Sequence, residues 1–158
     1  MHFKVASLLA VAASALTCAS TTNAWHIEKF TPICTTPFAP CSYSFGVTSA
    51  GSSDLPAFRA QCSDRSRSVY DPTFLACKIT SSGKDVEAVK AFVLFEEPDK
   101  NDREGLIWLW VDLTFKDGSG KAQTWHADKK GAFFKITNGP KDFNLGPVAG
   151  KGNPPTYA

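Results

Sequence analysis

The sequence predicts an all-β fold: a single-domain antiparallel β-barrel or sandwich, built from a meander of short strands and stapled by disulfides. Apolar and polar residues alternate with a period of two along most of the chain. Short polar segments rich in glycine separate these stretches, as expected when successive strands pair with one another. The 43% content of hydrophobic residues is enough for a packed core in a chain of 158 residues.

The first 24 residues have the features of a secretory signal peptide. Lys4 supplies a positive charge, residues 5–16 form an apolar run, and the small residues Thr22 to Ala24 follow. We expect cleavage after Ala24, which leaves residues 25–158 as one secreted, extracellular domain. The apolar run is shorter than the roughly 18 to 20 residues that span a bilayer, so we expect no membrane anchor.

Alternating segments and turn signals set the expected order of strands. In residues 41–48, Tyr43, Phe45 and Val47 share one face, and serine and threonine occupy the other. The same pattern predicts strands in WHIEKF (25–30), AFRAQC (57–62), FLACKIT (74–80), KAQTWHA (121–127) and GAFFKIT (131–137). Turns are expected at 50–56, 116–121 and 128–131, and the second contains an Asp-Gly pair typical of tight hairpins.

Residues 83–98 are ambiguous. Val86, Val89 and Val93 recur at helical spacing, so the segment could begin as a helix. The β-branched and aromatic residues at 92–95 favour a strand, which we expect from Ala88 onward.

Residues 106–115, LIWLWVDLTF, carry the clearest pattern in the chain. One apolar face is assigned to the core: Ile107, Leu109, Val111, Leu113 and Phe115. The opposite face contains Trp108 and Trp110, and Trp125 follows on the next expected strand. Two interpretations stay open. A loop, a terminus or a second layer could cover these tryptophans, or they could form an exposed patch for a partner, a ligand or a dimer contact.

Four cysteines remain once Cys18 leaves with the signal peptide, and an even number in an exported chain indicates two disulfides. Three connectivities are possible. We favour Cys34–Cys41 and Cys62–Cys77, because each bond then joins adjacent segments. A zinc site would need closely spaced cysteine or histidine pairs that the chain lacks, so we expect no metal and no cofactor.

No catalytic motif is present. The two histidines of the mature chain, His26 and His126, could serve a small secreted hydrolase or ribonuclease if they met across a barrel, but neither lies in a recognised motif. The formal net charge of +2 is small and its charges are interspersed, so nucleic acid is not an expected partner. The glycine- and proline-rich residues from about 146 predict a flexible C-terminal tail.

Several segments together resemble the Alternaria major allergen-like family of small fungal secreted proteins. They are WHIEKF, CSYSFGV, the FRAQC and FLAC pair around Cys62 and Cys77, and NGPKDF at 138–143. The resemblance implies a β-barrel in which the Cys62–Cys77 bond holds neighbouring strands in register beneath a polar outer loop. It also implies an elicitor or effector that acts in the plant apoplast.

The chain departs from that family at two positions that bear on assembly. Asn144 and Leu145 stand where the family has a cysteine after its G-P-K-D-F segment, and no cysteine precedes the first strand of the mature chain. A monomer or a non-covalent dimer is therefore expected. The leading hypothesis is a non-enzymatic effector that binds a host extracellular protein and modulates plant defence. The alternatives are a carbohydrate- or small-ligand-binding β-module using the three tryptophans, and the hydrolase.

Overall fold

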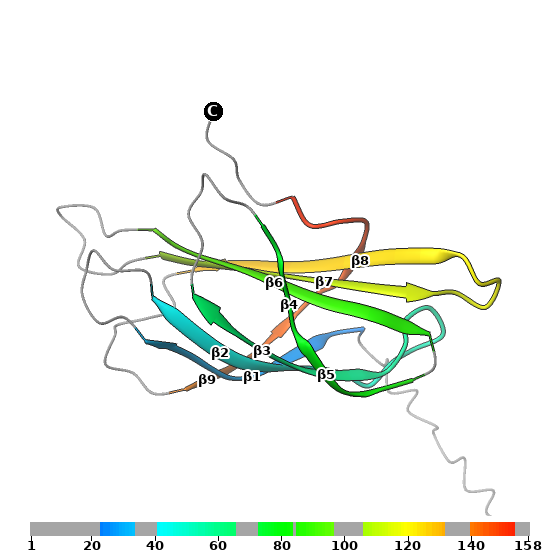
Figure 1. The fold of residues 1–158 in the computed structure, drawn as a ribbon, viewed down its shortest axis with the longest axis horizontal. Coiled ribbons are helices and arrows are strands. Elements are labelled where there is room, and N and C mark those ends of the chain that lie inside the picture. Colours follow the sequence, from blue (N-terminus) through cyan, green and yellow to red (C-terminus); the bar gives the residue numbers. More distant parts are fainter. Residues whose placement is uncertain are drawn as a thin grey trace, which may run out of the picture.

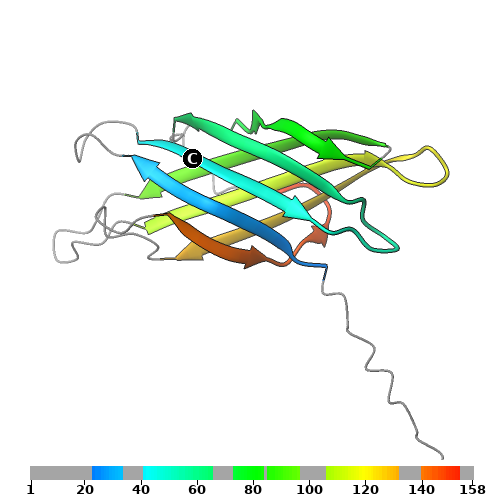
Figure 2. The same ribbon diagram turned by 90° about the horizontal axis from the view of Figure 1, so that it is seen from below.

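Two antiparallel five-stranded sheets pack face to face as a β-sandwich (Figures 1 and 2). A computed structural model describes residues 23–33, 41–65, 73–83, 85–96, 106–131 and 140–153. Those residues contain strands and no helix, so the all-β prediction is confirmed. Of the two architectures expected, the sheets form a sandwich and not a closed barrel.

Each sheet has a simple strand order. Sheet A runs β5 (Lys78–Ser82), β3 (Phe58–Arg65), β2 (Ser42–Ser49), β1 (Trp25–Ile33) and β9 (Lys141–Leu145). Sheet B runs β10 (Val148–Ala149), β8 (Ala122–Gly131), β7 (Leu106–Lys116), β6 (Val86–Glu96) and β4 (Leu75–Ala76). Both sheets therefore place their longest strands away from the edges.

The main core fills the space between the sheets. Strand β7 contributes the apolar face predicted from its alternation, with Ile107, Leu109, Val111, Leu113 and Phe115 between 0% and 5% exposed. Sheet A supplies the facing aromatic side chains, including Trp25, Phe30, Phe45 and Phe58. Burial of this set in a dry interface is the main source of stability, because each large apolar side chain contributes about 1.5 to 3 kcal/mol.

A β-bulge interrupts the alternation expected for residues 25–30. Strict alternation from Trp25 and Ile27 would turn Lys29 into the core. Instead Lys29 adopts a φ of 53°, the pairing of β1 shifts there with both of its neighbours, and Phe30 takes the buried position at 1% exposure. The extra residue in the bulge moves the next inward-facing position from residue 29 to residue 30. Asp142 Oδ1 accepts a 2.6 Å hydrogen bond from the Lys29 backbone N–H.

The segment predicted as one strand at 74–80 is two strands in different sheets. Strand β4 pairs with β6 in sheet B, strand β5 pairs with β3 in sheet A, and Cys77 is the residue between them.

The Cys62–Cys77 disulfide is formed, with its Cα atoms 4.4 Å apart, and it extends the β3–β5 ladder by one position. Cys41 is also disulfide-bonded. Its expected partner, Cys34, lies outside the described residues, as do the polar middle of the 62–77 loop and most of the strand predicted at 131–137.

The helical alternative for the start of residues 83–98 is wrong. Strand β6 begins at Val86, two residues before the expected start, and Val89 and Val93 are 1% and 0% exposed. The spacing of the three valines resembles that of a helix only because the pairing of β6 with β7 is irregular between Val86 and Ala88. That irregularity changes the phase of the strand by one residue.

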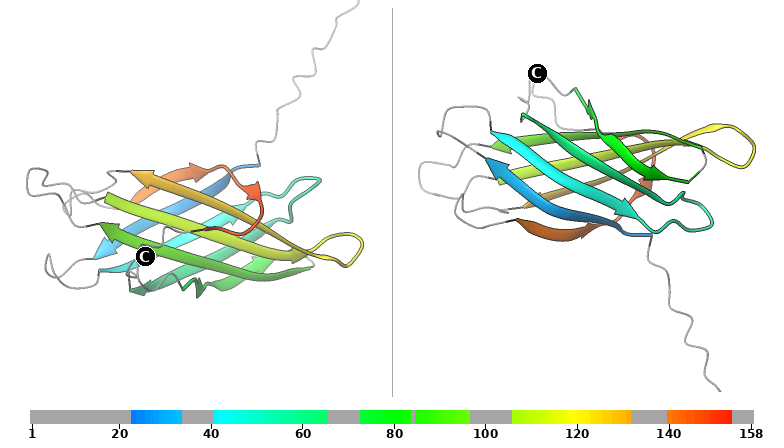
Figure 3. Two further views of the ribbon diagram at one scale, coloured as in Figure 1. Left: turned by 90° about the horizontal axis from the view of Figure 1, so that it is seen from above. Right: turned by 60° about the horizontal axis from the view of Figure 1, so that its bottom comes forward.

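The segment expected as a tail from about residue 146 contains strand β10. Val148 and Ala149 pair with His126 and Trp125 of β8, and the Gly150 N–H donates to the Thr124 carbonyl. Figure 3 shows the chain passing from β9 to β10 round one edge of the sandwich. Among the described residues there is no helix long and apolar enough to cross a membrane.

Candidate functional site

The outer face of sheet B carries a second, smaller apolar cluster. Phe92, Leu94 and Trp110 are its buried members, and Phe74 and Trp108 pack against them. The register of β6 and β7 explains the grouping, since Phe92 lies opposite Trp110 and Leu94 opposite Trp108. Side chains of directly opposed residues lie close enough to pack, so these four residues form a block on the sheet surface.

The two tryptophans of this cluster differ in exposure. Their rings are stacked, with centroids 5.3 Å apart and planes 21° apart. Trp110 is 4% exposed and its ring also packs against Phe92, with centroids 5.2 Å apart, so it belongs to a second layer as the first interpretation anticipated. Trp108 is half-buried, and Lys130 Nζ lies 3.6 Å from its ring centroid. Trp108 is thus more exposed than Trp110.

The indole nitrogens of Trp108 and Trp25 are covered donors. Neither Nε1 atom has a hydrogen-bond partner within the part of the chain that the structure describes. A buried unpaired donor costs about 1 to 3 kcal/mol, so each of these indole N–H groups lowers the stability of the folded state. Trp25 is wholly buried, and its ring packs edge-on to Phe58 with the centroids 5.6 Å apart, a contact that contributes about 0.5 to 1.5 kcal/mol.

Trp125 lies on the opposite side of sheet B from Trp108 and Trp110. In the β7–β8 ladder it pairs with Leu113, whose side chain points into the main core, and it packs against that core. Its outer part borders a hollow at the end of the sandwich. The three tryptophans therefore do not make a common surface.

Next to the aromatic cluster, the C-terminal segment crosses the outer face of sheet B. The Gly152 N–H donates to Asp112 Oδ1 at 3.0 Å, and His126 Nδ1 donates to the Gly150 carbonyl oxygen at 3.2 Å. A Cβ at Gly152 would lie 2.7 Å from Asp112 Oδ1 and 3.0 Å from Phe74, so the backbone is close to both. Residues 150–152 thus form a strap against β7 and β8.

The carboxyl group of Asp112 on this face has a raised pKa. Burial beneath the strap raises its pKa, and the Gly152 hydrogen bond, together with the charges of His126, Lys90 and Lys151, lowers it by a smaller amount. The group is therefore held in a less hydrated environment than an ordinary surface carboxylate.

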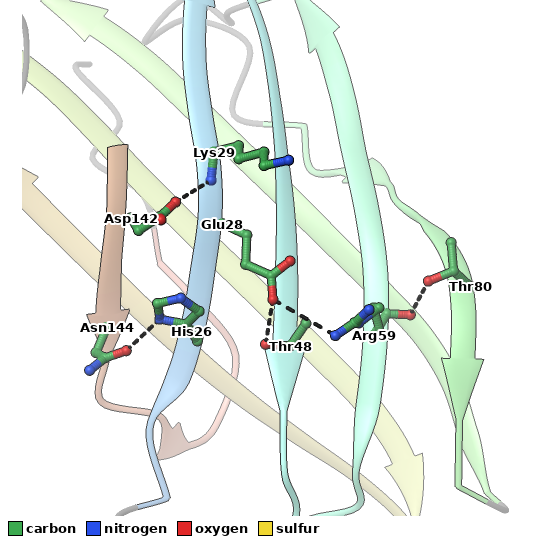
Figure 4. Close-up of polar contacts among 8 residues, drawn as sticks. All are labelled: His26, Glu28, Lys29, Thr48, Arg59, Thr80, Asp142 and Asn144. Carbon is green, nitrogen blue, oxygen red and sulfur yellow. Dashed lines mark hydrogen bonds and ion pairs between the residues drawn. The ribbon is translucent and has the colours of Figure 1, made fainter. Parts of the chain in front are cut away.

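The outer face of sheet A is polar, and several of its side chains contact one another (Figure 4). His26 Nδ1 donates to Asn144 Oδ1 at 2.8 Å. Glu28 accepts a 3.4 Å hydrogen bond from Thr48 and lies 3.9 Å from Arg59, folded over Gly46. Among the described residues this face carries one exposed large apolar side chain, Ile33, and no tryptophan. Of the two outer faces, sheet B therefore has the stronger features of a binding surface.

The two histidines lie far from a shared cleft. His26 is on the outer face of sheet A and His126 on the outer face of sheet B, with the main core between them. Within the described ranges no group of three or more histidine, cysteine or acidic side chains could hold a metal ion. Searches of protein-family models, curated proteins and solved structures find no match to this chain.

Proposed function

We propose that the protein is secreted and acts outside the cell as a non-enzymatic, effector- or elicitor-like protein that binds a host extracellular protein and modulates plant defence. The proposal combines the leader-like first 24 residues and the resemblance to fungal secreted proteins with the features of sheet B. The binding surface is the outer face around Trp108.

The observation that carries the proposal is the Trp108–Lys130 pair. Trp108 is partly exposed on a central strand, where pairing with β6 and β8 on both sides fixes its backbone. Its ring is stacked on a buried Trp110, and Lys130 Nζ lies over the Trp108 ring, 3.6 Å from its centroid. A preformed aromatic surface with a cation beside it can bind a partner with little ordering cost.

The charges of the same face favour a partner with an acidic segment. Among the side chains that the structure describes, lysines 90, 130 and 151 lie on or beside it, as do the acids Asp112 and Asp128. Asp112 is held beneath the strap by Gly152, whereas Lys130 lies at the Trp108 ring itself. A carboxylate on the partner could approach Lys130 while an apolar side chain covers the Trp108 ring.

The experiment is capture from host extracellular fluid followed by titration of the protein captured. We expect Trp108→Ala to weaken binding by about tenfold or more, because a tryptophan at the centre of an interface contributes roughly 2 kcal/mol. Lys130→Glu should weaken binding as well, by reversing the charge that meets the partner.

Arg59→Ala is the matched control, since it removes a charged side chain from the outer face of sheet A and should leave affinity unchanged. Circular dichroism must show that each variant keeps the β-sheet spectrum. Folded Trp108→Ala and Lys130→Glu variants that bind as tightly as the wild type would contradict the proposal. So would a loss of binding in Arg59→Ala equal to that in Trp108→Ala.

A further inference from the structure

A hollow of about 520 Å³ opens at the end of the sandwich beside the β7–β8 hairpin. Its walls come from the loop that precedes β3, from the hairpin itself, from Asp85 before β6 and from Ala149 of β10. Figures 1 and 3 show this hairpin, in yellow, projecting past the neighbouring strands. The volume falls in the range of about 300 to 1,000 Å³ that is typical of small-molecule sites.

The floor of the hollow is apolar and aromatic. Leu55 and Phe115 are 3% and 5% exposed and belong to the main core, so they are fixed in place. Trp125 stands beside them and remains partly exposed. The face of an indole ring carries partial negative charge and attracts a cation placed over it.

The rim is acidic. Among the described residues that line the hollow, Asp54, Asp85 and Asp117 are acidic and Lys116 is basic. Lys116 Nζ lies 3.2 Å from Glu87 Oε1, so its charge is already offset by an acid outside the hollow. The three carboxylates repel an anionic ligand and attract a cationic one.

Asp117 is a permanent part of this negative rim. Its carboxylate accepts hydrogen bonds from the Ser119 hydroxyl, the Gln123 side-chain amide and the Lys121 backbone N–H. These bonds hold the pKa of Asp117 well below its ordinary value, so the group stays ionised at any physiological pH. The same bonds fix the hairpin loop and orient Gln123 along the wall.

The opposite wall is also preformed. The Ser52 N–H donates to the Leu55 carbonyl at 2.8 Å, which closes a tight turn in the loop before β3. The Asp85 carbonyl accepts from the Lys116 N–H at 2.9 Å and ties the β5–β6 turn to the hairpin. A ligand would therefore enter an existing space without first ordering its walls.

We infer that this hollow binds a small organic cation, an ammonium group attached to an apolar or aromatic body. The body would lie on Leu55, Phe115 and Trp125, and the ammonium would face the carboxylates of the rim. This site lies at the end of the sandwich and does not include Trp108 or Lys130. It can therefore be tested independently of the proposed protein-binding face.

Three probes of nearly the same shape test the inference: phenethylammonium, the uncharged 2-phenylethanol and the anion phenylacetate. Tryptophan fluorescence and the indole N–H signal of Trp125 in NMR spectra report binding. We expect phenethylammonium to bind at least about tenfold more tightly than the alcohol, a difference of about 1.4 kcal/mol, and its affinity to fall as salt is raised. Phenylacetate should bind most weakly.

Two substitutions test whether phenethylammonium binds in this hollow. Asp54→Asn should weaken phenethylammonium binding several-fold, and the control Asp128→Asn, on the outer face of β8, should not change it. Trp125→Leu should abolish the fluorescence response and weaken binding measured by calorimetry. Equal affinities for the three probes, no saturable binding of phenethylammonium, or binding undiminished in Asp54→Asn and Trp125→Leu would each overturn the inference.

Discussion

Replacing the Cys62–Cys77 bond by alanines tests the disulfide at the edge of the sandwich. The two cysteines are 15 residues apart, and closing a loop of that length stabilises the folded state by about 3 kcal/mol in the chain-entropy treatment. Cys62 is 1% exposed within the main core, so its side chain also loses packing contacts when shortened. We therefore expect Cys62→Ala with Cys77→Ala to lower the free energy of unfolding by about 3 kcal/mol or slightly more, which corresponds to a fall in Tm on the order of 10 °C.

Urea unfolding followed by circular dichroism at neutral pH measures this difference. Substitution is cleaner than chemical reduction, because a reductant would also break the disulfide of Cys41. Peptide mapping without reductant establishes that the wild-type bond is present in the sample. An unfolding free energy within about 0.5 kcal/mol of the wild type would refute the reasoning, since even the low end of native-disulfide effects is about 2 kcal/mol.

Two further substitutions test local features. Gly51 has a φ of +80°, and a Cβ there would lie 2.8 Å from the Ala57 backbone nitrogen, so Gly51→Ala should cost about 2 kcal/mol or more; Gly120→Ala, with a φ of +82° but open space around it, should cost about 1 kcal/mol in the same thermal melts. Burial raises the pKa of Asp112, so its protonated form adds stability that is present below its ordinary pKa and is lost as pH rises through the raised value. Asp112→Asn should flatten the dependence of Tm on pH over this acidic range. If the variant and the wild type had the same dependence, the raised pKa of Asp112 would be contradicted.

The fold could be predicted where alternation was uninterrupted. Strand β7 has ten residues of unbroken pattern, and its core face was identified correctly. The pattern failed where one residue changes the geometry: the bulge at Lys29, and the change of sheet at Cys77. Neither has a strong local signal, because lysine is an uncommon residue at positive φ and a cysteine within an alternating stretch does not mark a corner.

The placement of Trp125 depended on the length of one turn. A two-residue loop at Asp117 and Gly118 would pair Trp125 with Trp110, on the outer face of sheet B. Instead the Asp117 N–H donates to the Lys121 carbonyl, and Gly120 takes a positive φ, as in hairpins with a three-residue loop. That register pairs Trp125 with Leu113 and turns its ring inward. The sequence DGSGK is compatible with either loop, so the face of Trp125 could not be inferred from it.

A short crossing joins the two sheets at each edge of the sandwich: Cys77 links β4 to β5, and Gly146 and Pro147 link β9 to β10. Each crossing joins the two layers covalently over one or two residues, and the first is fastened to β3 by the disulfide. Sliding one sheet over the other would break the hydrogen bonds between paired strands at both edges at the same time. The two layers should consequently exchange their central amide hydrogens only through global unfolding, with β2 and β7 protected to the same degree.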